Sequence, residues 1–554
     1  MNDDLNNALT RRALVQRALV GGAMAFAARL SPAQAWAATD QIPPRLHGLT
    51  VSNGGAPFAR DHTLLSTLSQ LENRRTALVD FELDRVAKVV LEAVKTRQGV
   101  DDVVWSEVAR LPAGRHQLAW TPDPALPPRT YLLRLTVMDK RGRRRVYGAN
   151  RPYVASAQSA PVVRILGVDA SFNERSYAPG QRAKLRVECD ASALTLQLFR
   201  CGPELAPTFK NDEMNGVEVT GQSVVDWRHQ RDEPGVLKVG IGEWPSGVYF
   251  ARLNADDGRV GFAPFIVRPG RLGTSRIAIV LPTNTWQAYN FSDPDGDGWG
   301  DTWYAGGSPP VTLDRHHLNR GVPHRFRSYD LAFIRWLDQT GKVVDYLSEE
   351  DVERFQSGEE LAAAYDLIVF AGHTEYVTER VYEFVERYRD LGGNLMFLSA
   401  NNFFWKVERR GNRIVRKQLW RNAGRPEARL IGVQYLANDD GTRQAPFVVT
   451  GEQSMPWAFE GTGLKNGDAF GVYGIEIDAA GPDSPPGTLV LAAMPDVFGP
   501  GRTAQMTYYE TPAGAKVFAA GVLNFGGSVV PVGRIQDRRI TKLLENIWAR
   551  LSIP

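Results

Sequence analysis

Two ionisable side chains, His373 and Glu375, follow the apolar run 367–370 and precede a helical pattern. Open α/β sheets bind their ligands at the carboxyl ends of parallel strands, so a histidine and a carboxylate here are placed for general acid–base catalysis. On residue types alone, a His-x-Glu after a strand is more often a capping or structural pair. The catalytic interpretation of His373 and Glu375 therefore needs support from elsewhere in the chain.

The residues around this pair predict a strand–helix–strand unit. Thr378 is suited to cap a helix and Glu379 to its positive first turn, while apolar residues recur at helical spacing from Val381 to Leu391. Gly392 and Gly393 are expected to end the helix, and residues 394–399 form the next buried strand. The pattern predicts a parallel sheet covered on both faces.

Length and composition indicate a multidomain folded protein. A chain of 554 residues, 43% hydrophobic and 23% charged, is too long for one core, so we expect about three domains. A net charge of +3 gives no argument for a nucleic-acid partner. After the first 40 residues no apolar run reaches 18, so we expect no membrane anchor in the mature chain.

The N-terminus reads as an export signal over residues 1–37. Arg11 and Arg12 lie in a segment that resembles the twin-arginine motif, a weakly hydrophobic segment follows, and Ala35-Trp36-Ala37 offers a cleavage site. The alternative is a frayed basic helix. Export by this route predicts a periplasmic or secreted protein, and it mildly favours a bound cofactor.

Cysteine usage leaves one question open. Cys189 and Cys201 are the two cysteines of the chain, and both lie in predicted strands of one domain. They could pair in an oxidising compartment or stay as buried thiols. Two cysteines cannot build a thiolate metal cage.

The middle of the chain predicts two immunoglobulin-like β-sandwiches, at 45–154 and 162–268. Short alternating segments such as 77–83 and 131–137 are separated by Gly, Pro and charged turns, and residues 155–161 read as a linker. An α/β domain is expected at 274–554, opening with the apolar strand 277–281. The predicted fold class is therefore multidomain β plus α/β.

Several motifs of the second half occur together in one known family. They are Trp286-Gln287-Ala288-Tyr289, the segment around His373 and Glu375, Gly392–Leu398, Asn401–Trp405 and Phe518–Gly521. In this order they resemble the large (beta) subunit of N,N-dimethylformamidase and its C-terminal-domain relatives. The resemblance implies an α/β domain similar to the class I glutamine-amidotransferase fold, without its catalytic cysteine.

The resemblance also implies a mononuclear iron site. The family holds its iron through two tyrosines and a glutamate with a histidine nearby, which correspond here to Tyr249, Tyr289, Glu375 and His373. A phenolate ligates at neutral pH only when a strongly Lewis-acidic ion displaces its proton, which favours ferric iron. On residue types alone, Tyr249 is an ordinary sandwich tyrosine and Tyr289 a packing residue.

The chain departs from this family in two respects. The relatives act inside the cell beside a small helical subunit, whereas this chain carries an export signal and an additional sandwich. Dimethylformamide is therefore not the expected substrate. We expect a small-molecule substrate, and leave open both a homo-oligomer and a small partner subunit.

An acidic insert directly after the tyrosine motif predicts a calcium site. Asp293, Asp295, Asp297 and Asp301 occupy positions 1, 3, 5 and 9 around Gly298 at position 6. This pattern resembles the calcium loops of thrombospondin type 3 repeats and begins like an EF-hand loop. The alternative is a solvated acidic turn, in which four close carboxylates would repel one another.

Weaker signals lie on either side of these motifs. His316, His317 and His324 could line a pocket or bind metal, although surface or capping roles are commoner for such histidines. Gly526-Gly527 indicates a close approach of two backbones.

Two functions of different class fit these observations. The first is an exported amide hydrolase with ferric iron, in which Tyr249, Tyr289 and Glu375 bind the metal and His373 and Glu375 take part in catalysis. The second is a non-catalytic periplasmic binding or adhesion protein stabilised by calcium. Metal content would separate the two.

Replacing both Arg11 and Arg12 by Lys is expected to leave the protein in the cytoplasm with residues 1–37 uncleaved, because the twin-arginine receptor reads both guanidinium groups. Cell fractionation and mass spectrometry of the N-terminus measure this. Periplasmic delivery at the wild-type level would contradict the export assignment.

Overall fold

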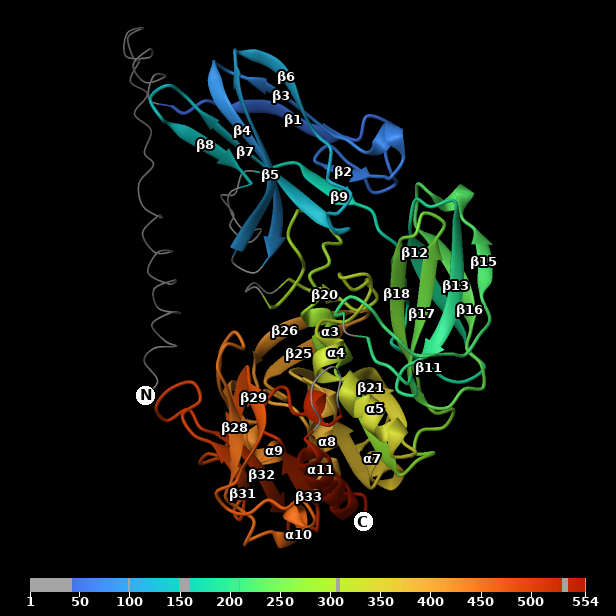
Figure 1. Ribbon diagram of the computed structural model, residues 1–554, viewed down its shortest axis with the longest axis vertical. Helices are drawn as coiled ribbons and strands as arrows, with labels where there is room; N and C mark the ends of the chain where they lie inside the picture. The colour runs from blue at the N-terminus through green and yellow to red at the C-terminus, as the bar shows by residue number, and fades with distance from the viewer. Residues whose placement is uncertain are drawn as a thin grey trace.

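The computed structural model describes residues 42–97, 100–148, 159–208, 210–304, 309–530 and 537–553. The predicted signal peptide and residues 155–158 of the predicted linker lie outside the described residues. Figure 1 shows three parts: a blue-to-teal group of strands, a green group, and a mixed helix and strand region from yellow to red. Within these ranges, no helix combines the length and apolar character needed to cross a membrane.

The first part is a β-sandwich in which a sheet of order β1-β3-β6 packs on a sheet of order β2-β9-β7-β4-β5, with β8 beside β7. Its core follows the alternation expected from the sequence, because Ala77, Val79, Phe81 and Leu83 of β3 are all buried. The strands are β1 (Leu46–Ser52), β2 (Leu65–Leu68), β3 (Ala77–Leu83), β4 (Ala87–Arg97), β5 (Val100–Leu111), β6 (Gly114–Trp120), β7 (Thr130–Met138), β8 (Arg144–Tyr147) and β9 (Val162–Ile165).

The boundary between the two sandwiches differs from the expected one. Residues 162–165 were expected to open the second sandwich, but β9 pairs with β2 and β7 of the first. The physical reason is burial, since Val163 and Ile165 complete the core of the first sandwich. The second sandwich therefore begins after β9.

The second part pairs a sheet of order β10-β12-β16 with a sheet of order β11-β18-β17-β13-β14, and β15 lies beside β13. Cys189 and Cys201 are both buried and both free, so they form no disulfide. The strands are β10 (Asp169–Phe172), β11 (Ser176–Tyr177), β12 (Arg182–Glu188), β13 (Ala193–Arg200), β14 (Val217–Glu218), β15 (Ser223–Asp226), β16 (Gly235–Gly240), β17 (Gly247–Ala255) and β18 (Val260–Val267).

Both sandwiches contain a tyrosine that bonds back to the chain before its own strand. The hydroxyl of Tyr131 in β7 donates to the carbonyl oxygen of Pro127 at 2.8 Å, and that of Tyr249 in β17 donates to the carbonyl oxygen of Pro245 at 2.8 Å. Such a tyrosine corner fixes the loop that enters the strand. Tyr249 thus has a structural role in its sandwich.

The third part is built on a nine-stranded sheet of order β21-β19-β22-β24-β33-β32-β31-β28-β29. The strands from β21 to β33 are parallel, and those from β32 to β29 are antiparallel. The strands of this part are β19 (Ile277–Leu281), β20 (Val311–Thr312), β21 (Asp345–Ser348), β22 (Leu367–Phe370), β23 (Tyr376–Thr378), β24 (Asn394–Phe397), β25 (Trp405–Arg410), β26 (Arg413–Leu419), β27 (Gln434–Asn438), β28 (Gln444–Val449), β29 (Ala469–Gly474), β30 (Glu476–Ala479), β31 (Leu489–Met494), β32 (Ala504–Glu510) and β33 (Lys516–Ala519).

Helices cover both faces of this sheet, as the sequence predicted. Ile368 and Phe370 of β22 pack with α8 on one face, and Leu367 and Val369 pack with α5 and α11 on the other. The helices are α3 (Thr283–Ala288), α4 (Phe326–Tyr329), α5 (Leu331–Gln339), α6 (Glu349–Val352), α7 (Gly358–Ala364), α8 (Glu379–Asp390), α9 (Ala428–Ile431), α10 (Pro456–Phe459) and α11 (Arg538–Leu551), with short 3-10 turns η1 (Glu72–Arg74), η2 (Arg228–Gln230), η3 (Arg421–Ala423) and η4 (Gly526–Ser528).

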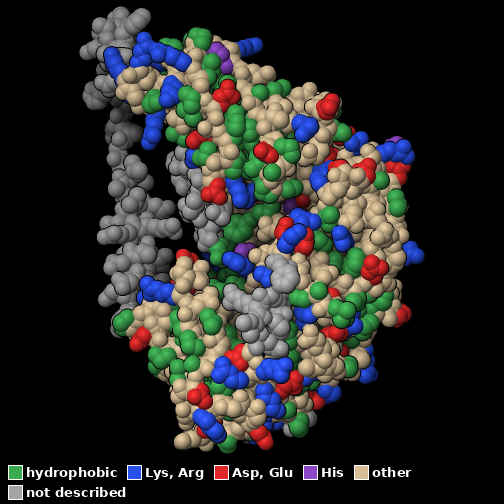
Figure 2. Space-filling view, in the orientation of Figure 1, with side chains coloured by type: hydrophobic (Ala, Val, Ile, Leu, Met, Phe, Trp, Pro, Cys, Tyr) green, Lys and Arg blue, Asp and Glu red, His purple; other side chains and the backbone are tan. Residues whose placement is uncertain are grey.

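The predicted strand–helix–strand unit is confirmed. β22 and β24 pair in parallel and α8 connects them, with the side chain of Thr378 accepting from the backbone N–H of Val381. Figure 2 shows one face of the molecule with acidic and basic side chains interspersed, in keeping with 65 basic and 62 acidic residues.

The close backbone approach expected at Gly526-Gly527 is confirmed. A methyl group at Gly527 would overlap the carbonyl oxygen of Ser328, and one at Gly526 would press on the carbonyl oxygen of Ala371 at 3.0 Å. η4 thus packs directly beneath the end of β22, where the candidate site begins.

Gly527→Ala is expected to lower the free energy of unfolding by about 1–3 kcal/mol, because the backbone must move away from Ser328. Chemical denaturation measures this. Gly481→Ala is the matched control, since nothing lies within 4 Å of a methyl group at Gly481. Equal stabilities of the two variants would contradict the steric argument.

Candidate functional site

The carboxyl ends of β19 and β22 bring Tyr289, His373 and Glu375 together. The two strands are parallel neighbours, Tyr289 ends α3 after β19, and the His-Thr-Glu segment follows β22. The hydroxyl of Tyr289 donates to Glu375 Oε2, and the rings of Tyr289 and His373 lie 5.5 Å apart. Three of the four residues that the resemblance implied for one site, Tyr289, His373 and Glu375, therefore lie together.

Glu476, at the start of β30, completes the charged cluster. His373 Nε2 lies 3.3 Å from Glu476 Oε2 and 3.7 Å from Glu375 Oε2. His373 and Glu375 are each only 4% exposed. Among the described residues, neither His373 Nε2 nor Glu476 Oε2 has a hydrogen-bond partner in good geometry, although their charges are close. These two buried atoms therefore interact mainly with each other, as an ion pair that lacks good hydrogen-bond geometry.

Burial sets the protonation of the cluster. Burial, reinforced by the charge of Glu375, raises the pKa of Tyr289 well above its ordinary value. Burial also raises the pKa of Glu375 to about 7, although the nearby His373 opposes the rise. Burial disfavours a charged imidazole, but the carboxylates of Glu476 and Glu375 outweigh it and raise the pKa of His373. Tyr289 is therefore a neutral phenol unless a cation displaces its proton.

Aromatic side chains surround Tyr289. Ring centroids of Tyr304, Tyr376 and His324 lie 5.0, 5.9 and 6.2 Å from that of Tyr289, and Phe291 packs against Tyr304. Tyr376 also interacts through its phenol with Tyr289 and Glu375. The cluster thus contains a second tyrosine, from the short strand β23.

Backbone hydrogen bonds hold the His-Thr-Glu segment from two sides. The N–H of Glu375 donates to Thr285 Oγ1 at 3.1 Å, while the N–H groups of Phe403 and Trp405 donate to the carbonyls of Thr374 and Glu375 at 2.8 and 2.9 Å. The direction in which Glu375 points is therefore determined by α3 and by the loop that follows β24.

Strained backbone is found in the segments that flank the cluster. Asn401 and Phe403 adopt φ values of 57° and 56°, and Ile475, directly before Glu476, adopts 73°. Positive φ is unusual for a phenylalanine and a genuine outlier for a β-branched isoleucine. Such strain persists where the surrounding structure enforces it, which is common at functional sites.

Tyr249 does not join this cluster. Its hydroxyl bonds to Pro245, its ring stacks on Trp244 at 5.5 Å, and its side chain is fully buried in the core of the second sandwich. The contacts described for Tyr249 do not include Tyr289, His373 or Glu375. The position implied by the resemblance therefore corresponds here to the tyrosine corner of a sandwich.

The three other histidines considered from the sequence are not surface residues. His316 Nε2 lies 3.7 Å from Asp169 Oδ2, and His317 contacts the side-chain amide of Gln287 at 3.3 Å. His324 packs in the aromatic group around Tyr289. Of the three, His324 lines the candidate site and the others lie in buried polar contacts.

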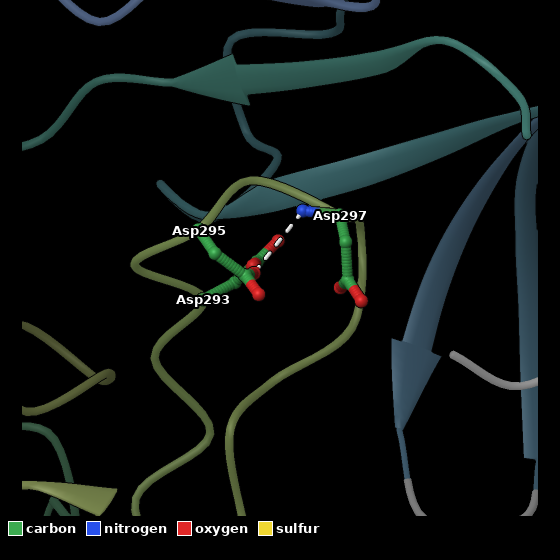
Figure 3. A group of neighbouring side chains, drawn as sticks. All are labelled: Asp293, Asp295 and Asp297. Atoms are coloured by element: carbon green, nitrogen blue, oxygen red, sulfur yellow. Dashed lines mark hydrogen bonds between the residues drawn. The ribbon is translucent and has the colours of Figure 1, made fainter. Parts of the chain in front are cut away.

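The acidic insert forms a compact loop against the first sandwich. Ligand atoms of Asp293, Asp295 and Asp297 all lie within 4.8 Å of one another, and Figure 3 shows their side chains gathered inside the loop. Asp301 lies outside this group, but burial and the charge of Asp295 raise its pKa to about 6. Burial and Asp295 also raise the pKa of Asp297 to about 7. Asp295 and Asp297 are exposed and Asp293 is half-buried, so mutual repulsion is the main cost of keeping these three carboxylates together.

Sequence reasoning missed Glu476 and Tyr376. Glu476 lies in a short strand far along the chain with no motif around it, so only the fold brings it to His373. Tyr376 directly follows Glu375 and was not considered a site residue, and adjacent side chains of an extended strand point to opposite faces. The break between β22 and β23 removes that alternation.

The fold and the site together define a β-rich multidomain protein whose α/β domain carries a buried Tyr-Glu-His cluster at the carboxyl edge of its parallel strands. The family model "N,N-dimethylformamidase beta subunit-like, C-terminal" matches residues 237–536, which is more than half of the chain. The chain belongs to this family. The matched region contains every residue of the cluster.

Curated relatives point in the same direction. The N,N-dimethylformamidase beta subunit of an Alcaligenes species is 26% identical over 321 residues, covering 47% of this chain and 41% of the relative. That of Paracoccus aminophilus is 30% identical over 122 residues, covering 22% and 16%. The matched regions thus span less than half of these relatives' length. A Salmonella alpha-2-macroglobulin reacted with methylamine aligns with 41% of this chain and 17% of its own at 11% identity, but its TM-score of 0.21 carries no argument.

Glu476→Gln is expected to lower the pKa of His373 in metal-free protein, because it removes the largest electrostatic stabilisation of the imidazolium. NMR titration of histidine-labelled protein measures the pKa. Glu452→Gln, whose carboxylate pairs with Lys465 at 2.7 Å, is the control that should leave it unchanged. An unchanged pKa in Glu476→Gln would show that this carboxylate does not act on His373.

Proposed function

We propose that this protein is a metal-dependent hydrolase of small amides, with ferric iron held by Tyr289 and Glu375. The observation that carries the proposal is the buried pairing of the Tyr289 phenol with the Glu375 carboxylate, beside the close charges of His373 and Glu476. Hard oxygen donors of this kind fit Fe³⁺, and a cation would compensate the carboxylates whose burial is otherwise costly. Tyr376 is the second phenol of the set.

The protein's own side chains would handle the protons. When bound, ferric iron would supply Lewis acidity toward an amide carbonyl and lower the pKa of water. His373 would move a proton from the attacking water to the leaving amine nitrogen, passing through the imidazolium that the carboxylates of Glu476 and Glu375 stabilise. Glu476 would hold the imidazole and stabilise its charged form. Glu375 would take part in catalysis because it lies between Tyr289 and His373 and interacts with both.

The surroundings of Tyr289 support a small, uncharged substrate. Tyr304, Phe291 and His324 form an aromatic wall, and burial lowers the pKa of His324 to about 4, so this wall is uncharged at neutral pH. An amide with short alkyl groups is compatible with such surroundings. The name of the relatives is the reason for proposing an amide as the substrate class. That this chain acts on such an amide is part of the proposal.

Three further expectations belong to this proposal. They are export by the twin-arginine route, immunoglobulin-like folds for the two sandwiches, and a glutamine-amidotransferase-like fold for the α/β domain. The tyrosine corners at Tyr131 and Tyr249 support the second. The site at the carboxyl ends of β19 and β22 supports the third. A small partner subunit like the one implied by the relatives' subunit names stays open.

Tyr289→Phe is expected to remove most of the iron, and with it a phenolate-to-iron charge-transfer band in the visible, because the change deletes one ligand oxygen and little volume. Metal analysis and absorbance measure this. Tyr249→Phe is the matched control and should keep iron and colour, while losing about 1 kcal/mol of stability with the bond to Pro245.

If Tyr249→Phe lost its iron and Tyr289→Phe kept it, Tyr249 would be an iron ligand and Tyr289 would not.

His373→Ala tests the catalytic assignment separately. It should keep the iron and lower the rate of hydrolysis of a small amide by roughly 10²–10⁴-fold. Wild-type protein that carries iron but hydrolyses no small amide would favour the non-catalytic alternative.

We also propose that Asp293, Asp295 and Asp297 bind a structural calcium ion. The loop joins two parts of the molecule, since Thr96 of β4 donates to the carbonyl of Gly298 and Trp299 packs on the apolar end of the first sandwich. The loop also begins four residues after Tyr289. A cation there would stabilise both the junction and the tyrosine segment.

Chelation of calcium is expected to lower the melting temperature of the wild type, and Asp295→Ala should abolish the effect. Calorimetry with and without chelator measures this. In the presence of chelator, Asp295→Ala should be at least as stable as the wild type, because it lacks one of the carboxylates that repel one another. Asp440→Ala, at an exposed acidic turn, should respond as the wild type does. Equal responses in all three proteins would show that the loop binds no calcium.

A further inference from the structure

A cavity of about 490 Å³ lies between the second sandwich and the α/β domain. Its walls come from the end of β13, the loop before β17, α5 and the start of β21. Ser275, before β19, and Asp345, the first residue of β21, both line it, so the cavity lies at the amino ends of these strands. The candidate metal centre lies at the opposite, carboxyl ends. The volume is typical of small-molecule sites, which are common between domains.

Arg200 is the cation in this cavity that is open to a ligand. Lys342 also lines the cavity, but its ammonium group already pairs with Glu545 at 3.2 Å and lies over the ring of Trp336 at 4.2 Å. The guanidinium of Arg200 reaches Asp338 only at 3.5 Å, which is long for a hydrogen bond. The Arg200 side chain is 28% exposed and lines the cavity, so a carboxylate there can accept charge-assisted hydrogen bonds from its guanidinium.

The other charges of the cavity limit the ligand to one negative charge. Asp345 is already hydrogen-bonded within the protein. One of its carboxylate oxygens accepts from the backbone N–H of Ser275 at 3.0 Å, and the other accepts from the hydroxyl of Tyr365 at 3.1 Å. Asp338 is 29% exposed and stays beside Arg200. A dianion such as phosphate would be repelled by Asp338, whereas a monoanion can share the guanidinium with it.

The rest of the cavity wall is apolar, and part of it is formed by the flat ring of Trp244. Trp244 stacks on Tyr249 with ring centroids 5.5 Å apart, which fixes its ring at the cavity edge. Ile334 and Leu337 of α5 face the cavity from the other domain. These side chains suit the hydrocarbon body of a small organic acid.

We propose that this cavity binds a small organic monocarboxylate, with the carboxylate on Arg200 and the apolar body against Trp244. The site is separate from the candidate metal centre and does not depend on the proposed hydrolase activity. Because its walls belong to two domains, an occupied cavity would also hold the second sandwich and the α/β domain together.

Isothermal titration calorimetry with benzoate tests the proposal. The wild type should bind one equivalent, and Arg200→Ala should bind at least tenfold more weakly. Benzamide, which has a similar shape without the charge, should also bind at least tenfold more weakly to the wild type. Arg252→Ala is the matched control, since Arg252 is an exposed arginine of β17 that contacts Asn254 and does not line the cavity.

Two further variants identify where benzoate binds. Asp338→Asn should bind benzoate more tightly, because it removes the carboxylate that competes for Arg200; this holds even if Arg200→Ala fails to fold. Glu375→Gln should bind benzoate as the wild type does. Equal binding by wild type and Arg200→Ala, equal binding of benzamide, stronger binding of inorganic phosphate, or loss of binding in Glu375→Gln would each overturn the proposal. Absence of iron from the wild-type protein would contradict the proposed metal centre but not the proposed carboxylate site.

Discussion

Holding the carboxylate of Glu375 inside the protein is the constraint on which the α/β domain depends. A carboxylate removed from water costs several kcal/mol unless donors or positive charge compensate it. The phenol of Tyr289 and the imidazole of His373 provide that compensation, and they reach Glu375 because β19 and β22 are parallel neighbours. Tyr376 interacts with the same carboxylate, and α3 and the loop that follows β24 hold the backbone of Glu375 in place. The sheet order and the burial of this carboxylate are therefore linked.

The segments around Glu375 have unusual backbone conformations and close backbone contacts. Phe403 and Ile475 keep left-handed backbones that their side chains disfavour, and η4 allows no side chain at Gly527. Each of these segments borders the charged cluster rather than forming it. The stability needed to maintain such strain comes from the large cores on the two faces of the sheet.

Local sequence patterns predicted much of the fold and part of the site. Alternation located β3 and β7, and helical spacing with a Thr378 cap located α8 between two parallel strands. His373, Glu375 and Tyr289 were also predicted to meet. Glu476 could not be predicted, because its contact with His373 depends on how a distant short strand crosses the sheet. The assignment of Tyr249 came from a family pattern, and the pattern does not reveal that its hydroxyl turns back to Pro245. β9 joined the first sandwich for a similar reason, since long-range pairing decides where a short strand belongs.

The two buried free thiols have a consequence for the order of assembly. Cys189 and Cys201 contribute to the second sandwich as small apolar side chains, and burial raises the pKa of both thiols. Their packing requires no oxidation step, so this sandwich can reach its final form in a reducing compartment. Its core can therefore be completed without contact with an oxidant, and the redox state of the compartment does not decide whether this sandwich packs.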